Sequence, residues 1–136
     1  MAVATLNLDR AALVRVGMEA ADQLVTRTTR QTRNSAVVNA PVDQGHLRAS
    51  ADMNVVRMGT RVVGGVVFRA PHALAVHDGS RAHTIRPRRG KVLRFEVGGE
   101  VVYARSVRHP GTRPRPFLFA ALEQVAGAAN FAVTKS

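Results

Sequence analysis

The stretch MNVVRMGTRVVGGVVF (residues 53–68) decides how the middle of the chain folds. Two runs rich in β-branched side chains, residues 53–57 and 61–68, are separated by Met58-Gly59-Thr60. Two such runs around a short connection that contains glycine are typical of a β-hairpin. Within the second run, Gly64-Gly65 predicts either a bulge or the close approach of another segment, because glycine has no side chain to keep a neighbour away.

A second hairpin is expected further along the chain. KVLRFEV (91–97) and EVVYARSV (100–107) flank Gly98-Gly99, and a two-residue hairpin turn of this kind needs positive φ angles. Alternation in the first strand puts Val92, Arg94 and Glu96 on a wet or interfacial face and Leu93, Phe95 and Val97 on a core face. Between the hairpins, PHALAVHDGS (71–80) indicates a short helix that ends at Gly79.

Helical periodicity precedes the hairpins, from about Leu8 to Asn39. Apolar and small residues recur at three- and four-residue steps between Leu13 and Thr28. Asn7 or Asp9 can cap the start of this helix. Pro41 should end it, because proline excludes the α conformation at the residue before it.

The second half of this helix, Thr26–Asn34 (TRTTRQTRN), has almost no apolar stripe. Two interpretations are open: the helix ends near Arg30, or its distal half projects and is covered by another subunit. A helix of about 30 residues spans roughly 45 Å, which is more than a compact domain of this size needs.

A C-terminal helix is expected from about Arg115 to Asn130, with Pro116 in its first turn, where a missing N–H costs nothing. The fold class is therefore α+β, with a long N-terminal helix and a C-terminal helix packed on an antiparallel sheet built from hairpins. We expect a single domain over residues 1–136, with a sheet region at 45–108, a short helix near 71–79 and a basic Pro/Gly arm at 106–116.

Composition excludes several classes of protein. The 136 residues include no cysteine, so disulfides and thiolate metal sites are excluded, which fits a reducing compartment. No apolar run approaches the roughly 20 residues of a membrane helix, and the N-terminus lacks the apolar core of a signal peptide. The expectation is a soluble chain with no membrane partner.

The chain is strongly basic. Twenty Lys+Arg residues against nine Asp+Glu give a net charge of +11 with histidine neutral, and all but two of these bases are arginine. Aromatic residues make up 4%, which is too few for a platform that stacks nucleic-acid bases. The bases concentrate between Arg81 and Arg115, where only Glu96 and Glu100 oppose them. Such a surface meets DNA phosphates or the acidic face of a protein, and the sequence leaves both open. The predicted basic surface comprises Arg81, Arg86, Arg88, Arg89, Lys91, Arg94 and Arg105.

Enzyme motifs are weak. RPRRGKV (86–92) lacks the upstream glycine and the following Ser/Thr of a phosphate-binding loop. His72, His77, His83 and Asp78 are close in sequence, but their spacing matches no zinc signature, and a hydrolytic site would need a second carboxylate as base. We therefore expect no catalytic residue, cofactor or metal. A small metal-dependent enzyme stays as the weaker alternative.

Three stretches, in this order and spacing, resemble the neck or tail-completion proteins of long-tailed bacteriophages. They are VDQGHLRAS (42–50), PHALAVHDGSRAHTIRPRRGKVLRFEV (71–97) and VRHPGTRPRPFLFAAL (107–122). Together with the long N-terminal helix of the family pattern, the resemblance extends over most of the chain. One departure is His72, where many relatives carry an aromatic residue before the alanine, and it affects a packing contact. The family pattern falls on Pro41, Gly45, Leu47, Arg48 and Ser50 at the entry to the sheet, on Ala73, Val76, Gly79 and Ser80 at the end of the short helix, and on His109, Pro110, Gly111, Thr112, Pro116, Phe117 and Leu118 near the C-terminal helix.

The resemblance implies a structural virion protein of the head–tail junction, made in the host cytoplasm and assembled as a ring, hexameric about the tail axis, around the DNA channel. Its implied partners are copies of itself, other neck and tail proteins (head-completion, tail-terminator or tail-tube rings) and, weakly, the phosphates of genomic DNA. A sequence-independent nucleic-acid-binding protein is the alternative from another class. The expected assembly arm, whose prolines fix φ in advance and so lower the ordering cost of docking, comprises Arg108, His109, Pro110, Gly111, Thr112, Arg113, Pro114, Arg115, Pro116 and Phe117.

Overall fold

The computed structural model describes residues 10–128, and the chain divides into two compact units. Unit 1 comprises residues 1–71 and 117–136, and unit 2 comprises His72–Pro116. Each unit is described by itself, and the single domain stays a prediction. The expected caps Asn7 and Asp9, the helix start at Leu8 and the helix end at Asn130 lie outside the described residues.

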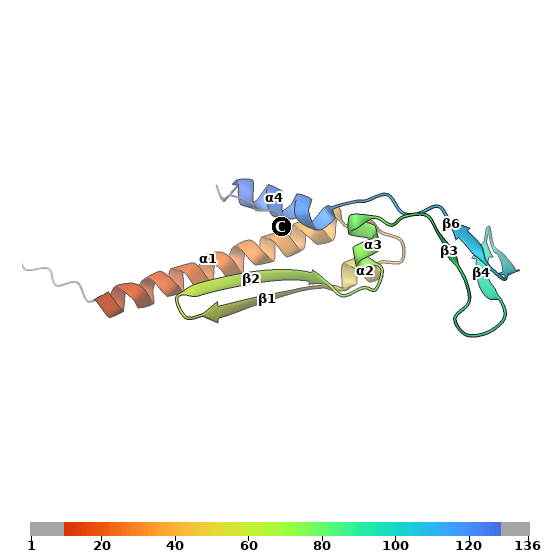
Figure 1. Ribbon diagram of the computed structural model, residues 1–136. Coiled ribbons are helices and arrows are strands. Elements are labelled where there is room, and N and C mark those ends of the chain that lie inside the picture. Colours follow the sequence, from red (N-terminus) through yellow and green to blue (C-terminus); the bar gives the residue numbers. More distant parts are fainter. Residues whose placement is uncertain (1–9, 129–136) are drawn as a thin grey trace, which may run out of the picture. The chain divides into compact units, whose positions relative to one another are not determined.

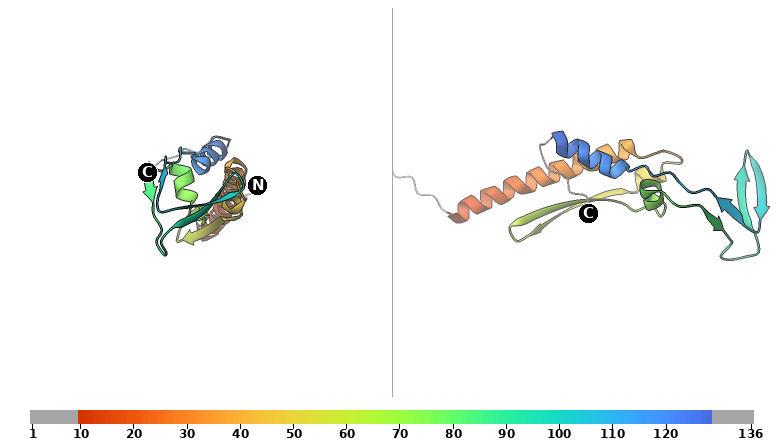
Figure 2. Two further views of the ribbon diagram at one scale, coloured as in Figure 1. Left: turned by 90° about the vertical axis from the view of Figure 1, so that its right-hand side faces the viewer. Right: turned by 45° about the horizontal axis from the view of Figure 1, so that its top comes forward.

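Unit 1 is built around one long helix (Figure 1). Helix α1 (Arg10–Asn39) is followed by the short α2 (His46–Ala49) and by an antiparallel hairpin of β1 (Ala51–Met58) and β2 (Arg61–Phe68). Helix α4 (Phe117–Ala128) returns to the unit, and both α4 and the hairpin lie along α1 (Figures 1 and 2). The predicted α+β class is confirmed: the long N-terminal helix and the C-terminal helix pack with small antiparallel hairpin sheets.

The hairpin resolves the alternatives at Gly64-Gly65. Its register runs without interruption from Ala51 opposite Phe68 to Met58 opposite Arg61, so no bulge is present. Gly64 is instead a close approach, because a Cβ atom placed there would overlap Thr29 Oγ1 and would lie 3.1 Å from Val25 Cγ1. The absence of a side chain at this position is what lets β2 lie directly on α1.

The buried part of α1 is its polar half. Thr29, Thr32 and Ala36 are buried, whereas Leu13 and Val16 in the apolar half are 54% and 65% exposed. Both interpretations of Thr26–Asn34 were therefore wrong: the helix continues to Asn39, and the chain's own hairpin and α4 cover its distal half. Small threonine and alanine side chains permit close packing there, and the sequence pattern alone presented them as a solvated face.

The core contains few large side chains. Among the described residues, six of the eight buried hydrophobic residues are alanines, and the other two are Leu47 and Phe117. Phe117 is 5% exposed and meets Phe68 edge to face, with ring centroids 4.9 Å apart. The aromatic pair joins the start of α4 to the end of β2.

Unit 2 consists of one short helix and two small sheets. Helix α3 (Ala73–Asp78) ends at Gly79, as predicted. Strands β4 (Leu93–Val97) and β5 (Glu100–Ala104) form the expected hairpin, with Gly98 and Gly99 at φ 60° and 87°. The sequence analysis missed the second sheet, in which β3 (His83–Ile85) pairs with β6 (Val107–His109) across more than twenty intervening residues.

The predicted core face of β4 is only partly covered. Leu93 and Phe95 are half-buried, but Val97 at the end of that face is 58% exposed. The opposite face, with Arg94 and Glu96, is exposed as expected. Among the described residues of unit 2, Ala73 is the one buried hydrophobic residue, so this unit has almost no interior of its own.

Replacing Gly64 with alanine should destabilise unit 1, because the new methyl group would meet the side chains of Thr29 and Val25. The expected loss of unfolding free energy is about 1–3 kcal/mol, measured by urea denaturation followed by circular dichroism. Gly17→Ala is the matched control: nothing lies within 4 Å of that Cβ position, and the change should stabilise the helix by up to about 1 kcal/mol. Equal stability of Gly64→Ala and the parent chain would contradict the close approach.

Candidate assembly surfaces

The sheet-entry residues form a structural clamp at the end of α1. Gly45 adopts φ 80° ahead of α2, and Leu47 is buried. Arg48 donates from Nε to the Ala40 carbonyl oxygen at 3.0 Å and from Nη2 to the Val38 carbonyl oxygen at 2.9 Å. The last carbonyl groups of a helix lack partners within the helix, and a guanidinium group there supplies both hydrogen bonds and favourable charge.

Ser50 completes the clamp. Its hydroxyl donates to the Leu47 carbonyl oxygen at 2.7 Å, and its own carbonyl oxygen accepts a hydrogen bond from the Arg69 N–H at 3.1 Å. The element Gly45, Leu47, Arg48 and Ser50 thus joins α1, α2 and the hairpin within unit 1. The side chains of Leu47 and Arg48 are engaged by their own chain, which assigns this element to folding.

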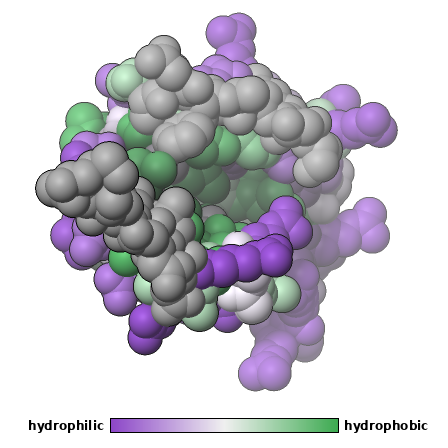
Figure 3. Space-filling model, turned by 90° about the vertical axis from the view of Figure 1, so that its left-hand side faces the viewer, coloured by the Kyte–Doolittle hydropathy of each residue, from purple (hydrophilic) through white to green (hydrophobic). Residues whose placement is uncertain are grey.

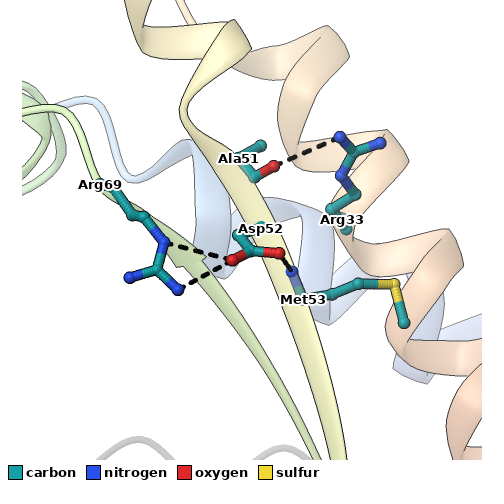
Figure 4. Close-up of polar contacts among 5 residues, drawn as sticks. All are labelled: Arg33, Ala51, Asp52, Met53 and Arg69. Carbon is teal, nitrogen blue, oxygen red and sulfur yellow. Dashed lines mark hydrogen bonds and ion pairs between the residues drawn. The ribbon is translucent and has the colours of Figure 1, made fainter.

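An ion pair that the sequence analysis missed links the open ends of the hairpin strands (Figure 4). Arg69 donates to Asp52 Oδ2 from Nη2 at 2.8 Å and from Nε at 3.2 Å, while Asp52 Oδ1 accepts from the Met53 N–H at 2.8 Å. Arg33 of α1 donates to the Ala51 carbonyl oxygen at 3.3 Å. The hydrogen bond from Arg69, followed by that from Met53, lowers the pKa of Asp52.

The expected assembly arm is paired along its length with residues 76–85 of unit 2. Beyond the β3–β6 pairing, Thr112 and Ser80 exchange two backbone hydrogen bonds of 3.0 and 2.9 Å, and the Ser80 hydroxyl oxygen accepts a further bond from the Thr112 N–H at 3.1 Å. The Arg115 N–H donates to the carbonyl oxygens of Val76 and His77 at the end of α3. The expectation that prolines limit the ordering cost of this segment stays a prediction, and the structure adds backbone pairing with residues 76–85, a two-stranded ribbon, as a second source of order.

Gly111 is the tightest point of this ribbon. It has φ 93°, and a Cβ atom on it would overlap the Ser80 carbonyl oxygen. Its N–H donates to His109 Nδ1 at 3.0 Å. Gly79, on the segment that pairs with the arm, is also closely approached: its φ is 79°, and the Thr112 carbonyl oxygen lies 2.7 Å from the position of a Cβ atom. The glycines of the family-like pattern are therefore required by backbone geometry.

Three of the five histidines take part in two separate side-chain pairs. His83 and His109 lie directly opposite each other on β3 and β6 with their rings stacked, centroids 5.0 Å apart. Because His109 Nδ1 accepts from Gly111, and His83 Nδ1 lies 2.9 Å from the Arg81 carbonyl oxygen, the two rings carry their Nδ1 groups in opposite roles. His77 Nδ1 lies 2.6 Å from Asp78 Oδ1. Within residues 10–128 there is no group of three or more His, Asp or Glu side chains that could hold a metal ion.

The predicted basic surface is solvent-accessible throughout. All seven of its residues are exposed, as are Arg108, Arg113 and Arg115, and in unit 2 three carboxylates (Asp78, Glu96 and Glu100) oppose these ten cations. None of the ion pairs that the structure shows within residues 10–128 involves any of the ten. Four of them (Arg86, Arg88, Arg89 and Lys91) lie on the connection between β3 and β4. In the part of the chain that is described, no helix is both long and apolar enough to cross a membrane.

Removing the guanidinium group next to Asp52 should raise the pKa of that carboxyl group. In Arg69→Gln, the Asp52 pKa measured by NMR titration should return toward the ordinary aspartate value of about 3.9. Because the folded-state pKa of the parent chain is depressed, the stability that the pair contributes is present above about pH 4 and is lost as the pH falls through the folded pKa. The control is Arg61→Gln on the same hairpin, and a shift of equal size there would contradict the assignment.

Gly111→Ala should open the ribbon locally, because the methyl group would displace Ser80. We expect faster amide hydrogen exchange at Thr112 and Ser80, with helix content unchanged. Gly90→Ala is the matched control: Gly90 also has a positive φ, 105°, but nothing lies within 4 Å of its Cβ position. Equal exchange at Thr112 and Ser80 in both variants would contradict the local opening of the ribbon in Gly111→Ala.

Comparison with known proteins adds no evidence on the fold or on the candidate surfaces. No family model, curated protein or solved structure matches this chain. The resemblance to phage neck proteins therefore rests on the sequence motifs around Arg48, Gly79 and Gly111, and it stays a prediction.

Proposed function

We propose that this chain is a structural subunit of a phage head–tail connector, a tail-completion or head–tail joining component that assembles as a ring around the DNA channel. The observation that carries the proposal is the imbalance between its interior and its surface. Eighteen large hydrophobic side chains are exposed among the described residues, while the buried hydrophobic set is mostly alanine. A chain of this kind gains most of its apolar burial from neighbours.

The basic surface of unit 2 fits the same role. Its ten exposed cations have no ion-pair partner among the described residues, and nine of them are arginine, whose planar fork binds carboxylates in pairs of hydrogen bonds. An acidic face on an adjacent ring would satisfy them. Arg108, Arg113 and Arg115 lie on the segment that pairs with residues 76–85, and this pairing lowers the ordering cost of their docking.

The second candidate is a sequence-independent nucleic-acid-binding protein. The same excess of exposed cations favours it, since phosphate contacts supply nearly all of the affinity in non-specific binding. The low aromatic content counts against a base-stacking mode. Under this alternative the protein would bind DNA tightly by itself, whereas a lumen that lets DNA slide needs only weak, salt-sensitive contacts.

The direct test is the place of the protein in assembled particles of the phage that encodes it. We expect a mostly monomeric chain at micromolar concentration by sedimentation, and symmetric copies, six in number, at the junction of head and tail in a particle map. A particle map without symmetric copies there would overturn the proposal, even if the purified chain self-associates.

Charge reversal separates the two candidates. Arg88→Glu/Arg89→Glu should block the joining of heads and tails, because it replaces guanidinium groups that would meet carboxylates on a neighbouring ring. The matched control is Arg27→Glu/Arg30→Glu on α1, also exposed, which changes the net charge equally and should leave joining intact. Weak DNA binding should fall equally in both variants. Normal joining together with a selective loss of DNA binding in the Arg88/Arg89 variant would favour the second candidate.

A further inference from the structure

Unit 1 contains an apolar groove that its own described residues leave open. The groove has a volume of about 580 Å³ and lies between α1, β2 and α4. Seen from the end of the unit at which α1 begins, hydrophobic side chains gather in a hollow (Figure 3). The lining of the groove includes Leu24, Thr32, Arg61, Val63, Gly64 and Phe119.

The large apolar side chains that form the walls of this groove are only partly buried. Leu24 of α1 is 43% exposed, Val63 of β2 is 43% exposed, and Phe119 of α4 is 39% exposed. At the floor, Thr32 is buried and its hydroxyl has no hydrogen-bond partner among the described residues. Covering such walls would gain about 25 cal/mol for each Å² of apolar surface removed from water.

The first turns of α1 form a second unfinished apolar surface, here called the overhang (residues 10–20). In Figures 1 and 2 the overhang extends past the turn of the β1–β2 hairpin and past α4. Its large apolar side chains Leu13, Val14 and Val16 are 54%, 49% and 65% exposed. Leu13, Gly17, Ala20 and Leu24 recur at three- and four-residue steps, so the stripe on the overhang continues into the groove wall.

The groove and the overhang cannot meet within one chain. Both include the same uninterrupted helix α1, and the overhang points away from the groove along the helix axis. A straight helix cannot bring its first turns back onto its own later turns. The two surfaces can, however, cover each other between two copies of the chain, in the head-to-tail manner that generates rings or open helical filaments.

We propose that the groove of unit 1 receives the α1 overhang of a second copy, with Leu13 and Val16 entering between Leu24, Val63 and Phe119. The match is apolar and does not rest on net charge: Arg61 lines the groove, while the overhang carries exposed Arg10 and Arg15 beside exposed Glu19. Glu19, next to Ala20, is the overhang's carboxylate that could meet Arg61, and within residues 10–128 the structure shows no ion pair for either residue. The overhang spans roughly 16 Å, long enough for its apolar stripe to lie along the groove. This inference rests on the proposed function, because it names the contact that would close the ring.

Cysteine cross-linking tests the contact directly, since the parent chain has no cysteine. Purified full-length Leu13→Cys and Val63→Cys variants, one carrying a mass tag, are mixed in equal amounts and oxidised. We expect the mixed disulfide dimer to exceed either like-with-like dimer several-fold, even where the free chain is mostly monomeric, because oxidation traps transient contacts. The matched control pairs Val63→Cys with Val38→Cys, which is 71% exposed on the same helix at its other end.

Three outcomes would overturn the proposal. The first is a statistical distribution of dimers from Leu13→Cys and Val63→Cys. The second is equal cross-linking of Val38→Cys, which would show random collision. The third is cross-linking at Val63 that appears only after residues 129–136 are removed, which would show that the chain covers its own groove.

A charge in the overhang gives an independent readout. Val16→Asp should abolish the mixed cross-link between Leu13→Cys and Val63→Cys, whereas Val38→Asp should leave it intact; both sites are exposed, so circular dichroism should report an unchanged fold. An intact cross-link in Val16→Asp would count against the proposal. A specific cross-link in a protein that is absent from the head–tail junction would overturn the proposed function and leave the groove contact standing.

Discussion

The close approach of α1 and β2 at Gly64 sets the spacing on which unit 1 depends. Because this position has no Cβ atom, Thr29 of α1 sits directly over the strand, and the hairpin can follow the helix. Two elements this close leave room only for small residues between them. The same preference for small residues is seen in the rest of the core of unit 1, which includes Ala36, Ala51 and Ala121.

An interior of alanines has a thermodynamic consequence. Burying a small side chain removes less apolar surface from water than burying a large one, so each buried residue contributes less to stability. The larger residues, such as Val16, Met58 and Val63, are left on the surface instead. This distribution, with small residues inside and large aliphatic residues outside, is the observation on which the proposed assembly with other molecules rests.

Much of the fold follows from local pattern. The 53–68 hairpin, the turn at Gly98-Gly99 and the helix end at Gly79 were predictable because the glycines adjoin strand or helix periodicity. The packing of Thr26–Asn34 was not, since periodicity detects hydrophobicity and not the small size that lets a threonine be buried. The pairing of β3 with β6 and the ion pair of Asp52 with Arg69 join residues far apart in sequence, and local patterns carry no information on such contacts.

The candidate sites show the same contrast between what local sequence patterns predict and what only the structure shows. The sequence motifs include Arg48, Gly79 and Gly111, and the structure gives each of them a role in the backbone: hydrogen bonds to the end of α1 at Arg48, and close approaches at the two glycines. Residues needed to fold the ribbon and exposed residues that we propose meet a partner therefore lie side by side in the arm, where Gly111 is enclosed and Arg113 is exposed. A motif can reflect either requirement. Burial and hydrogen bonding separate the two, and by that criterion we assign the proposed assembly contacts to the exposed arginines and the α1 overhang, and not to the glycine motifs.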